Sequence, residues 1–276
     1  MKKTISLTDK DKYRLKLLAE MIDAGANEFS RDIKIDALSR KQFFLYLNFA
    51  AVNNYSEAVY KLCSDMRPFA ASVILRSIVE AFINMGYLLS HNSDKRCVLF
   101  SMEGSYYKRS LSNEIIAFFS KHHQFEKGRF NIASFKKAIK KVNREIDLYK
   151  KNHGFQFNSK KDFEKEYHTN LLERARVADR RFKNPIFEHT YILAYRYFSE
   201  YAHLKAVGLN HFVKEYPNHY EMMAGQYNEV GHIIGTVMTI YIYFLSELKK
   251  RKMLRKSFPF KKFDRVWNEE FNKKKK

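Results

Sequence analysis

One short polar run, Arg196 to His203, has the residue types that metal-independent RNA cleavage needs. Four of its residues share one face of a helix, at positions i, i+3, i+4 and i+7: Arg196, Ser199, Glu200 and His203. Histidine titrates near neutral pH and can move the proton of a 2′-hydroxyl or of a leaving oxygen. Arginine can hold a phosphate through two parallel N–H groups and stabilise its developing charge. The pattern predicts Arg196 and His203 as catalytic residues; the alternative is a solvated face with an ordinary Arg196–Glu200 ion pair.

A second polar line runs through an otherwise apolar segment, Pro68–Ser90. Its members follow one another at intervals of four residues: Arg76, Glu80 and Asn84. Polar groups in a core helix are costly unless they are paired. One interpretation is an Arg76–Glu80 ion pair that fixes helix register. The other is that this line faces the Arg196–His203 face and completes a polar pocket, to which Ser199 and Glu200 also contribute and which Tyr107 and Arg109 border.

The motifs of most cofactor-dependent enzymes are missing from the sequence. It contains no glycine-rich phosphate loop, no dinucleotide fingerprint, no His-Glu-x-x-His and no serine nucleophile elbow. No pair among the 10 histidines has metal-ligand spacing with carboxylate neighbours. Cys63 and Cys97 are too few for a disulfide framework or a zinc site, and both sit in apolar stretches. We expect chemistry by side chains alone, without metal or cofactor.

The charge of the chain predicts a polyanionic partner, most simply RNA. Lys and Arg number 51 against 30 Asp and Glu, which gives a net charge of +21. The segment Lys249–Lys276 alone holds 13 basic and 3 acidic residues. Six of its cations are our candidates for binding nucleic acid: Lys249, Lys250, Arg251, Lys252, Arg255 and Lys256. A solubilising tail and attraction to anionic lipid are the alternatives.

The elements that must position these residues are predicted to be helices. Hydrophobic residues make up 45% of the chain, with only 4 Pro and 9 Gly, which favours an all-α multi-helix bundle with long core helices. Period and capping residues predict successive helices over Thr8–Asn27, Ser39–Asp65, Pro68–Ser90, Ser93–His122, Phe130–Asn152, Ser159–Asp179 and Pro185–Leu204, then a long core helix ending near Leu254. The only strand candidates are His211–Tyr216 and Phe258–Trp267.

Composition divides the chain into one helical-bundle domain, residues 1–253, and a basic C-terminal tail, residues 254–276. Residues 121–183 are more polar than their flanks and are interpreted as a helical insertion. The apolar run Val230–Leu248 approaches the length of a membrane span, but His232 and Glu247 interrupt or border it, which favours a core helix.

The basic N-terminus has no apolar run after it, so we expect a cytoplasmic protein rather than an exported or membrane one.

The stretch from Arg196 to His203, RYFSEYAH, resembles the signature of HEPN domains, in which Arg, four to six residues and His mark metal-independent ribonucleases. The pairing of RSIVEA, Arg76–Ala81, with Ser-x-Tyr-x-His, Ser199–His203, also looks like an uncharacterised group of bacterial helical proteins. The HEPN resemblance implies a helical bundle whose active site forms across a homodimer. It also implies that Arg196 positions the scissile phosphate, that His203 is the acid–base residue and that Glu200 or Glu80 orients one of them.

Two functions follow as hypotheses. The first is a metal-independent RNA endonuclease, acting as a toxin or antiviral-defence effector with a protein partner, as the resemblance implies. The second is a non-enzymatic nucleic-acid-binding subunit of a larger bacterial complex, since some HEPN domains only bind or scaffold. A membrane-acting protein is the least favoured reading.

Overall fold

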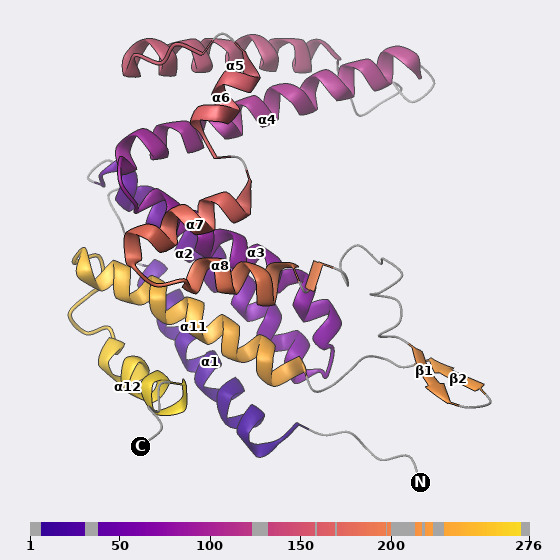
Figure 1. Ribbon diagram of the computed structural model, residues 1–276, viewed down its shortest axis with the longest axis vertical. Coiled ribbons are helices and arrows are strands. Elements are labelled where there is room, and N and C mark those ends of the chain that lie inside the picture. The colour runs from indigo at the N-terminus through magenta and orange to yellow at the C-terminus, as the bar shows by residue number, and fades with distance from the viewer. Residues whose placement is uncertain are drawn as a thin grey trace. The chain divides into compact units, whose positions relative to one another are not determined.

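The computed structural model describes residues 7–30, 38–122, 132–157, 159–168, 170–196, 198–199, 213–216, 219–222 and 229–271. The chain forms two compact units, one from residues 1–90 and 171–276 and the other from residues 91–170. The predicted all-α bundle is confirmed, because every long element in these ranges is a helix (Figure 1). A short antiparallel hairpin pairs β1 (Val213–Tyr216), which falls within the strand candidate His211–Tyr216, with β2 (His219–Met222).

The larger unit is built from both ends of the chain. Its helices are α1 (Asp9–Phe29), α2 (Arg40–Ser64), α3 (Pro68–Leu88), α7 (Leu171–Phe182), α8 (Ile186–Thr190), the π-helical segment η3 (Tyr191–Arg196), α11 (Glu229–Lys250) and α12 (Phe260–Phe271) (Figure 1). Contacts join α2, α3 and α11 to one another, and α1 packs on α2 and α11. On the other side, α7, α8 and η3 pack on α3.

Helix starts in this unit are set by local capping chemistry, as predicted. The Thr8 side chain accepts the backbone N–H of Asp11, which satisfies a donor at the start of α1. Ser39 and Gln42 form a reciprocal capping box at the start of α2. Pro68 occupies the first turn of α3, where its missing N–H costs nothing.

The core is apolar and centred on α3 and α11. Both helices are long and apolar enough to cross a membrane, but most of each apolar stretch is buried inside the bundle, as in a soluble protein. The buried hydroxyl of Tyr241 on α11 bonds the carbonyl of Met21, 2.9 Å away, and the side chain of Asn53. Gly25 permits this approach, because a Cβ there would collide with both Tyr241 and Asn53.

The smaller unit consists of α4 (Ser93–Lys121), α5 (Ile132–His153) and α6 (Lys160–Glu166). Long helices α4 and α5 pack side by side (Figure 1). Helix α5 buries Val142 and Ile146 and leaves most of its lysines exposed, while the Lys150 amino group donates to the Phe157 carbonyl at 2.6 Å. The unit runs from residue 91 to 170, whereas the sequence predicted an insertion at 121–183. The difference arises because α4 packs on α5, while α7 packs on α3 of the larger unit.

The helix predicted from Ser159 to Asp179 is two helices. Ser159 caps α6 as expected, but α6 ends at Glu166 and Tyr167 is extended, with φ −110° and ψ 117°. The Tyr167 ring is fully buried in the smaller unit, and its hydroxyl lies 3.0 Å from Glu103 Oε2. The chain leaves the helical conformation at Tyr167 because the extended backbone there lets the Tyr167 ring be buried.

Much of the segment interpreted as a basic tail is folded. Helix α12 covers part of the strand candidate Phe258–Trp267, which is therefore wrong. Phe263 is buried against the core, and Trp267 Nε1 donates to Thr239 Oγ1 of α11 at 3.3 Å. The apolar side chains of α12 recur at helical spacing, and their burial holds the helix on the bundle.

Candidate functional site

The segment that leads to Arg196, α8 followed by η3, is held at its start by Asp179 near the end of α7. Its two carboxylate oxygens accept the backbone N–H groups of Phe187 and Glu188, at 2.9 and 2.8 Å, and so fix the first turn of α8. Partial burial raises the pKa of Asp179, which the two backbone hydrogen bonds oppose. From this anchored start, α8 passes directly into η3.

Arg196 is the last residue of the π-helical segment η3. Such turns are rare and occur often at functional sites. Arg196 is exposed, and it forms no ion pair with any residue that the structure describes. Ser199 is half-buried, and its hydroxyl donates to the backbone carbonyl of Tyr195. Glu200 and His203 lie outside the described residues, so the predicted Arg196–His203 pair and Arg196–Glu200 pair stay predictions.

Arg76 on α3 packs against the segment that carries Arg196. Its guanidinium carbon lies 4.8 Å from the centroid of the Tyr195 ring, which is a cation–π contact. Its Nε is buried and has no hydrogen-bond partner among the residues that the structure describes. Helix α3 contacts η3 along this stretch. Arg76 thus lies beside the residue that precedes Arg196 in the chain.

The three polar residues of α3, Arg76, Glu80 and Asn84, do not form one connected polar cluster. Glu80 is exposed, and the expected Arg76–Glu80 ion pair is absent from the described part of the structure. Asn84 is buried and accepts a hydrogen bond from Arg174 of α7, with Nη1 to Oδ1 at 2.8 Å. The three residues diverge because each meets a different neighbour: Tyr195 covers Arg76, α7 covers Asn84, and Glu80 faces solvent.

Tyr107 and Arg109, expected to border the pocket, belong to α4 of the smaller unit. Arg109 is engaged there, with its guanidinium carbon 4.8 Å from the Tyr106 ring centroid and its Nη1 3.4 Å from Asn143 Oδ1. Tyr107 is 67% exposed.

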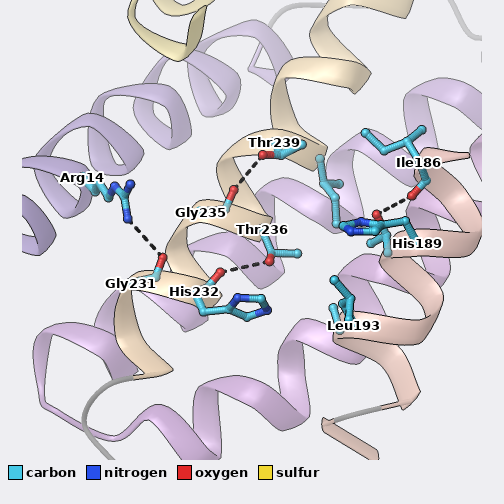
Figure 2. Close-up of a pocket in the computed structure, with 12 residues that line it drawn as sticks. Arg14, Ile186, His189, Leu193, Gly231, His232, Gly235, Thr236 and Thr239 are labelled. Carbon is cyan, nitrogen blue, oxygen red and sulfur yellow. Dashed lines mark hydrogen bonds between the residues drawn. The ribbon is translucent and has the colours of Figure 1, made fainter. Parts of the chain in front are cut away.

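A groove beside η3 brings together two histidines that sequence analysis did not connect. It has a volume of about 410 Å³ and lies between α8 with η3, α11 and the Arg14 side chain of α1 (Figure 2). His189 points from α8 toward α11, and His232 points from α11 toward Leu193 of η3 (Figure 2). The His232 ring also lies 5.8 Å from the ring of Phe198, centroid to centroid, within the Arg196–His203 run. The sequence does not indicate this arrangement, because the two histidines are 43 residues apart and share only the groove that α8, η3 and α11 line.

Small residues of α11 open this groove. Gly231, Gly235 and Thr236 line it, and Arg14 Nη1 lies 3.5 Å from the Gly231 carbonyl oxygen (Figure 2). The described residues include no cluster of three or more His, Cys, Asp or Glu side chains suited to a metal ion. The groove therefore offers two imidazoles and a guanidinium over a largely apolar floor.

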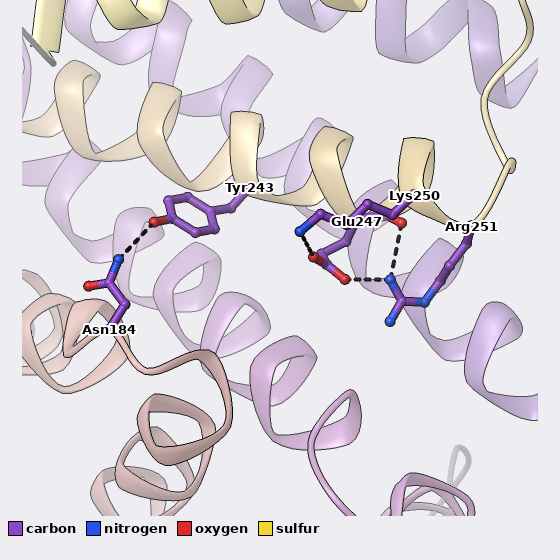
Figure 3. Close-up of polar contacts among 5 residues, drawn as sticks. All are labelled: Asn184, Tyr243, Glu247, Lys250 and Arg251. Atoms are coloured by element: carbon purple, nitrogen blue, oxygen red, sulfur yellow. Dashed lines mark hydrogen bonds and ion pairs between the residues drawn. The ribbon is translucent and has the colours of Figure 1, made fainter.

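Half of the six C-terminal cations predicted to bind nucleic acid pair with buried carboxylates of the fold. Buried Glu247 pairs with Lys250 at 2.7 Å and with Arg251, near a separate Asn184–Tyr243 hydrogen bond (Figure 3). Arg255 pairs with fully buried Glu28, Nε to Oε2 at 3.1 Å. Three predicted binding residues thus have a structural partner in a carboxylate.

The other three C-terminal candidates, Lys249, Lys252 and Lys256, form no ion pair with a carboxylate that the structure describes. Lys249 Nζ lies 4.1 Å from the centroid of the Phe260 ring. Lys252 and Lys256 are exposed, and neither side chain has an ion pair in the described ranges. They remain open to a ligand.

Comparison with known proteins gives a family and nothing more specific. The model of a family of unknown function, DUF5677, matches residues 42–220, well over half of the chain. This chain belongs to the DUF5677 family. No curated protein and no solved structure matches it.

The DUF5677 range separates the two groups of candidate residues. It begins in α2 and ends in β2, so it contains Arg76, Glu80 and the run from Arg196 to His203. Helices α11 and α12, with His232 and the C-terminal cations, follow it. A property of the DUF5677 family as a whole would therefore rest on α3 and the Arg196 segment rather than on the basic C-terminal end.

Proposed function

We propose that this DUF5677 protein is a metal-independent RNA endonuclease of the HEPN type, acting in the cytoplasm as a toxin or antiviral-defence effector. The observation that supports it is the contact between Arg76 and Tyr195. Through it, α3 brings a second guanidinium group to the segment that ends in exposed Arg196. Two arginines on adjoining elements are suited to holding a phosphodiester.

The proposed reaction is an internal transfer of the phosphate. His203 takes the proton of the 2′-hydroxyl, the 2′ oxygen attacks phosphorus, and the bond from phosphorus to the 5′ oxygen breaks. The proton held by His203 then passes to the departing 5′ oxygen. Arg196 binds the non-bridging oxygens as their charge grows, with Arg76 in support. The products are a 2′,3′-cyclic phosphate and a 5′-hydroxyl end.

The test is RNA cleavage by the purified chain in EDTA, with analysis of the product ends. We expect cyclic phosphate ends, and a loss of at least about a hundredfold in rate for Arg196→Ala and for His203→Ala. Matched controls are Arg181→Ala and His91→Ala, which change exposed residues of the same types and should leave the rate unchanged. Dependence on a divalent metal, or equal rates in the site variants and the controls, would contradict the proposal.

Two further properties belong to this proposal through the HEPN resemblance. The active site would form in a homodimer, and a protein partner would restrain or activate it. Mass measurement by light scattering tests the first, with a mass twice that of the 33.0 kDa chain as the expected result.

A second candidate function is a non-enzymatic nucleic-acid-binding subunit of a larger bacterial complex. Lys252 and Lys256 favour it, because both are exposed and neither has an ion pair with a residue that the structure describes. It predicts RNA binding that weakens steeply with salt and persists in both Arg196→Ala and His203→Ala. Cleavage in EDTA that both variants abolish would exclude it.

A further inference from the structure

The turn from α11 to α12 encloses a pocket of about 600 Å³, wholly within the larger unit. That volume is in the range of sites for small-molecule ligands. The pocket is formed by the end of α11, the connecting segment and the first residues of α12. It lies beyond the matched family range and apart from the Arg196 segment.

The wall of this pocket is strongly cationic. Six basic side chains and no acidic one line it: Lys249, Lys252, Arg255, Lys256, Lys261 and Lys262. Arg255 and Lys262 are neutralised from outside the pocket, by Glu28 at 3.1 Å and Glu20 at 2.8 Å. Lys252, Lys256 and Lys261 are exposed, with no ion pair in the part of the chain that the structure describes. Such a concentration of uncompensated charge attracts anions.

Lys252 is held in a backbone conformation that favours glycine. Its φ is 56°, and it ends α11 with a Lys252 N–H bond to the Lys249 carbonyl and a Met253 N–H bond to the Leu248 carbonyl. A lysine in the left-handed region is less stable there than glycine by roughly 1 kcal/mol. The chain thus carries a cation in the pocket lining at a position whose backbone conformation glycine would suit better.

The rest of the pocket lining, its floor, is apolar. Leu254, Phe258, Pro259 and Phe260 form it. Buried Met253 and Phe263 hold this floor on the bundle. A ligand that fits both parts carries several negative charges on one side and a flat, weakly polar group on the other.

We propose that this pocket binds a phosphorylated nucleoside, with the phosphate chain on Lys252, Lys256 and Lys261 and the nucleoside against the apolar floor. Lysines bind phosphate as separate point charges, which suits a flexible polyphosphate. The same chemistry is present in a free nucleotide and at the 5′-phosphorylated end of RNA. The pocket does not depend on whether the protein cuts RNA.

Titration calorimetry of the full chain with AMP, ADP, ATP and tripolyphosphate tests the proposal. We expect saturable 1:1 binding that strengthens with each phosphate, and weaker binding of tripolyphosphate than of ATP. Combined Lys252→Gln, Lys256→Gln and Lys261→Gln should weaken ATP binding by about tenfold or more. The control is Lys137→Gln, Lys140→Gln and Lys141→Gln on α5, which removes the same charge from exposed lysines and should change the affinity less than about twofold.

The variant Lys252→Gly distinguishes a loss of ATP binding from a loss of folding stability. It should keep or raise the thermal stability of the chain, because glycine suits the turn, and still weaken ATP binding. Short RNAs with 5′-triphosphate or 5′-hydroxyl ends then identify the source: preference for the triphosphate RNA over ATP indicates an RNA end, and the reverse a free nucleotide.

Three results would overturn the proposal. One is no saturable binding of any nucleotide. Another is equal weakening by both triple variants, which would indicate diffuse charge. The third is binding to phosphatidylserine vesicles alone, which would assign the lysines to a membrane surface.

Discussion

The guanidinium carbon of Arg76 lies 4.8 Å from the ring centroid of Tyr195, and this contact couples α3 to the segment that ends at Arg196. A double-mutant cycle with Arg76→Met and Tyr195→Leu should give a coupling energy of about 0.5–2 kcal/mol in urea unfolding. Tyr195→Leu should be the costlier single change, since Arg76→Met also removes a buried Nε that has no hydrogen-bond partner in the described ranges. Additive effects would show that the contact contributes nothing.

Arg255 should stabilise the fold rather than bind nucleic acid. Arg255→Met removes the guanidinium group that pairs with Glu28, a carboxylate that is only 1% exposed, and keeps the Arg255 backbone N–H bond to the other Glu28 oxygen. We expect a loss of about 2–3 kcal/mol in the free energy of unfolding. Lys256→Met, one residue away and exposed, should change it by less than about 0.5 kcal/mol. Equal effects of the two changes would show that the Glu28 pair is not structural.

Two helical glycines should respond to alanine with opposite signs. A Cβ at Gly86 would lie 2.6 Å from Phe187 Cζ and 2.9 Å from Ala178 Cβ, so Gly86→Ala should destabilise by about 1–3 kcal/mol. At Gly104, within α4, the same Cβ meets nothing within 4 Å. Gly104→Ala should stabilise by about 0.5–1 kcal/mol. Thermal unfolding measures both; a stabilising Gly86→Ala would mean that α3 and α8 can move apart.

The two thiols should be unreactive in the folded protein. Cys63 and Cys97 are both buried, and burial, with a smaller effect of Asp11, raises the pKa of Cys63 to about 12. We expect no rapid reaction with a thiol reagent at pH 8 and two reactive groups per chain in urea. Rapid labelling of one thiol in the native state would show local opening.

The raised pKa of Cys63 also predicts the sign of a pH effect. The unfolded thiol loses its proton near pH 9.0 and the folded one near 12, so the unfolded state binds fewer protons between these values. Stability from this group is therefore complete below pH 9 and falls above it, by up to about 1.4 kcal/mol per pH unit. The difference in unfolding free energy between the native chain and Cys63→Ala isolates this effect; a constant difference from pH 8 to 11 would refute it.

Features of the fold that depend on local chemistry were predictable. Thr8, Ser39 and Ser159 accept N–H groups from residues three positions ahead, and Pro68 needs only a first turn, so these helix starts follow from the sequence. The break at Tyr167 was missed because it depends on Glu103 and the aromatic residues around it, which are distant in the sequence. The π-helical turn at Tyr191–Arg196 has no signature in its composition.

The candidate site was predictable only in its residue types. Spacing suggested Arg76 with Glu80, but in the described part of the chain Arg76 contacts the Tyr195 ring, which a pattern within α3 cannot indicate. The facing of His189 and His232 across a groove likewise depends on how α8 and α11 pack. The charge of the C-terminal segment was evident, yet its division into structural and unpaired cations required the positions of Glu28 and Glu247.

The contact of Arg174 with Asn84 and the Tyr87 ring places the start of α7 beside the end of α3. The two chain ends that lead into and out of residues 91–170 are therefore close neighbours within the bundle. Replacing residues 91–170 by a short linker would therefore leave the core of the larger unit closed, as for a domain inserted into a loop of another domain.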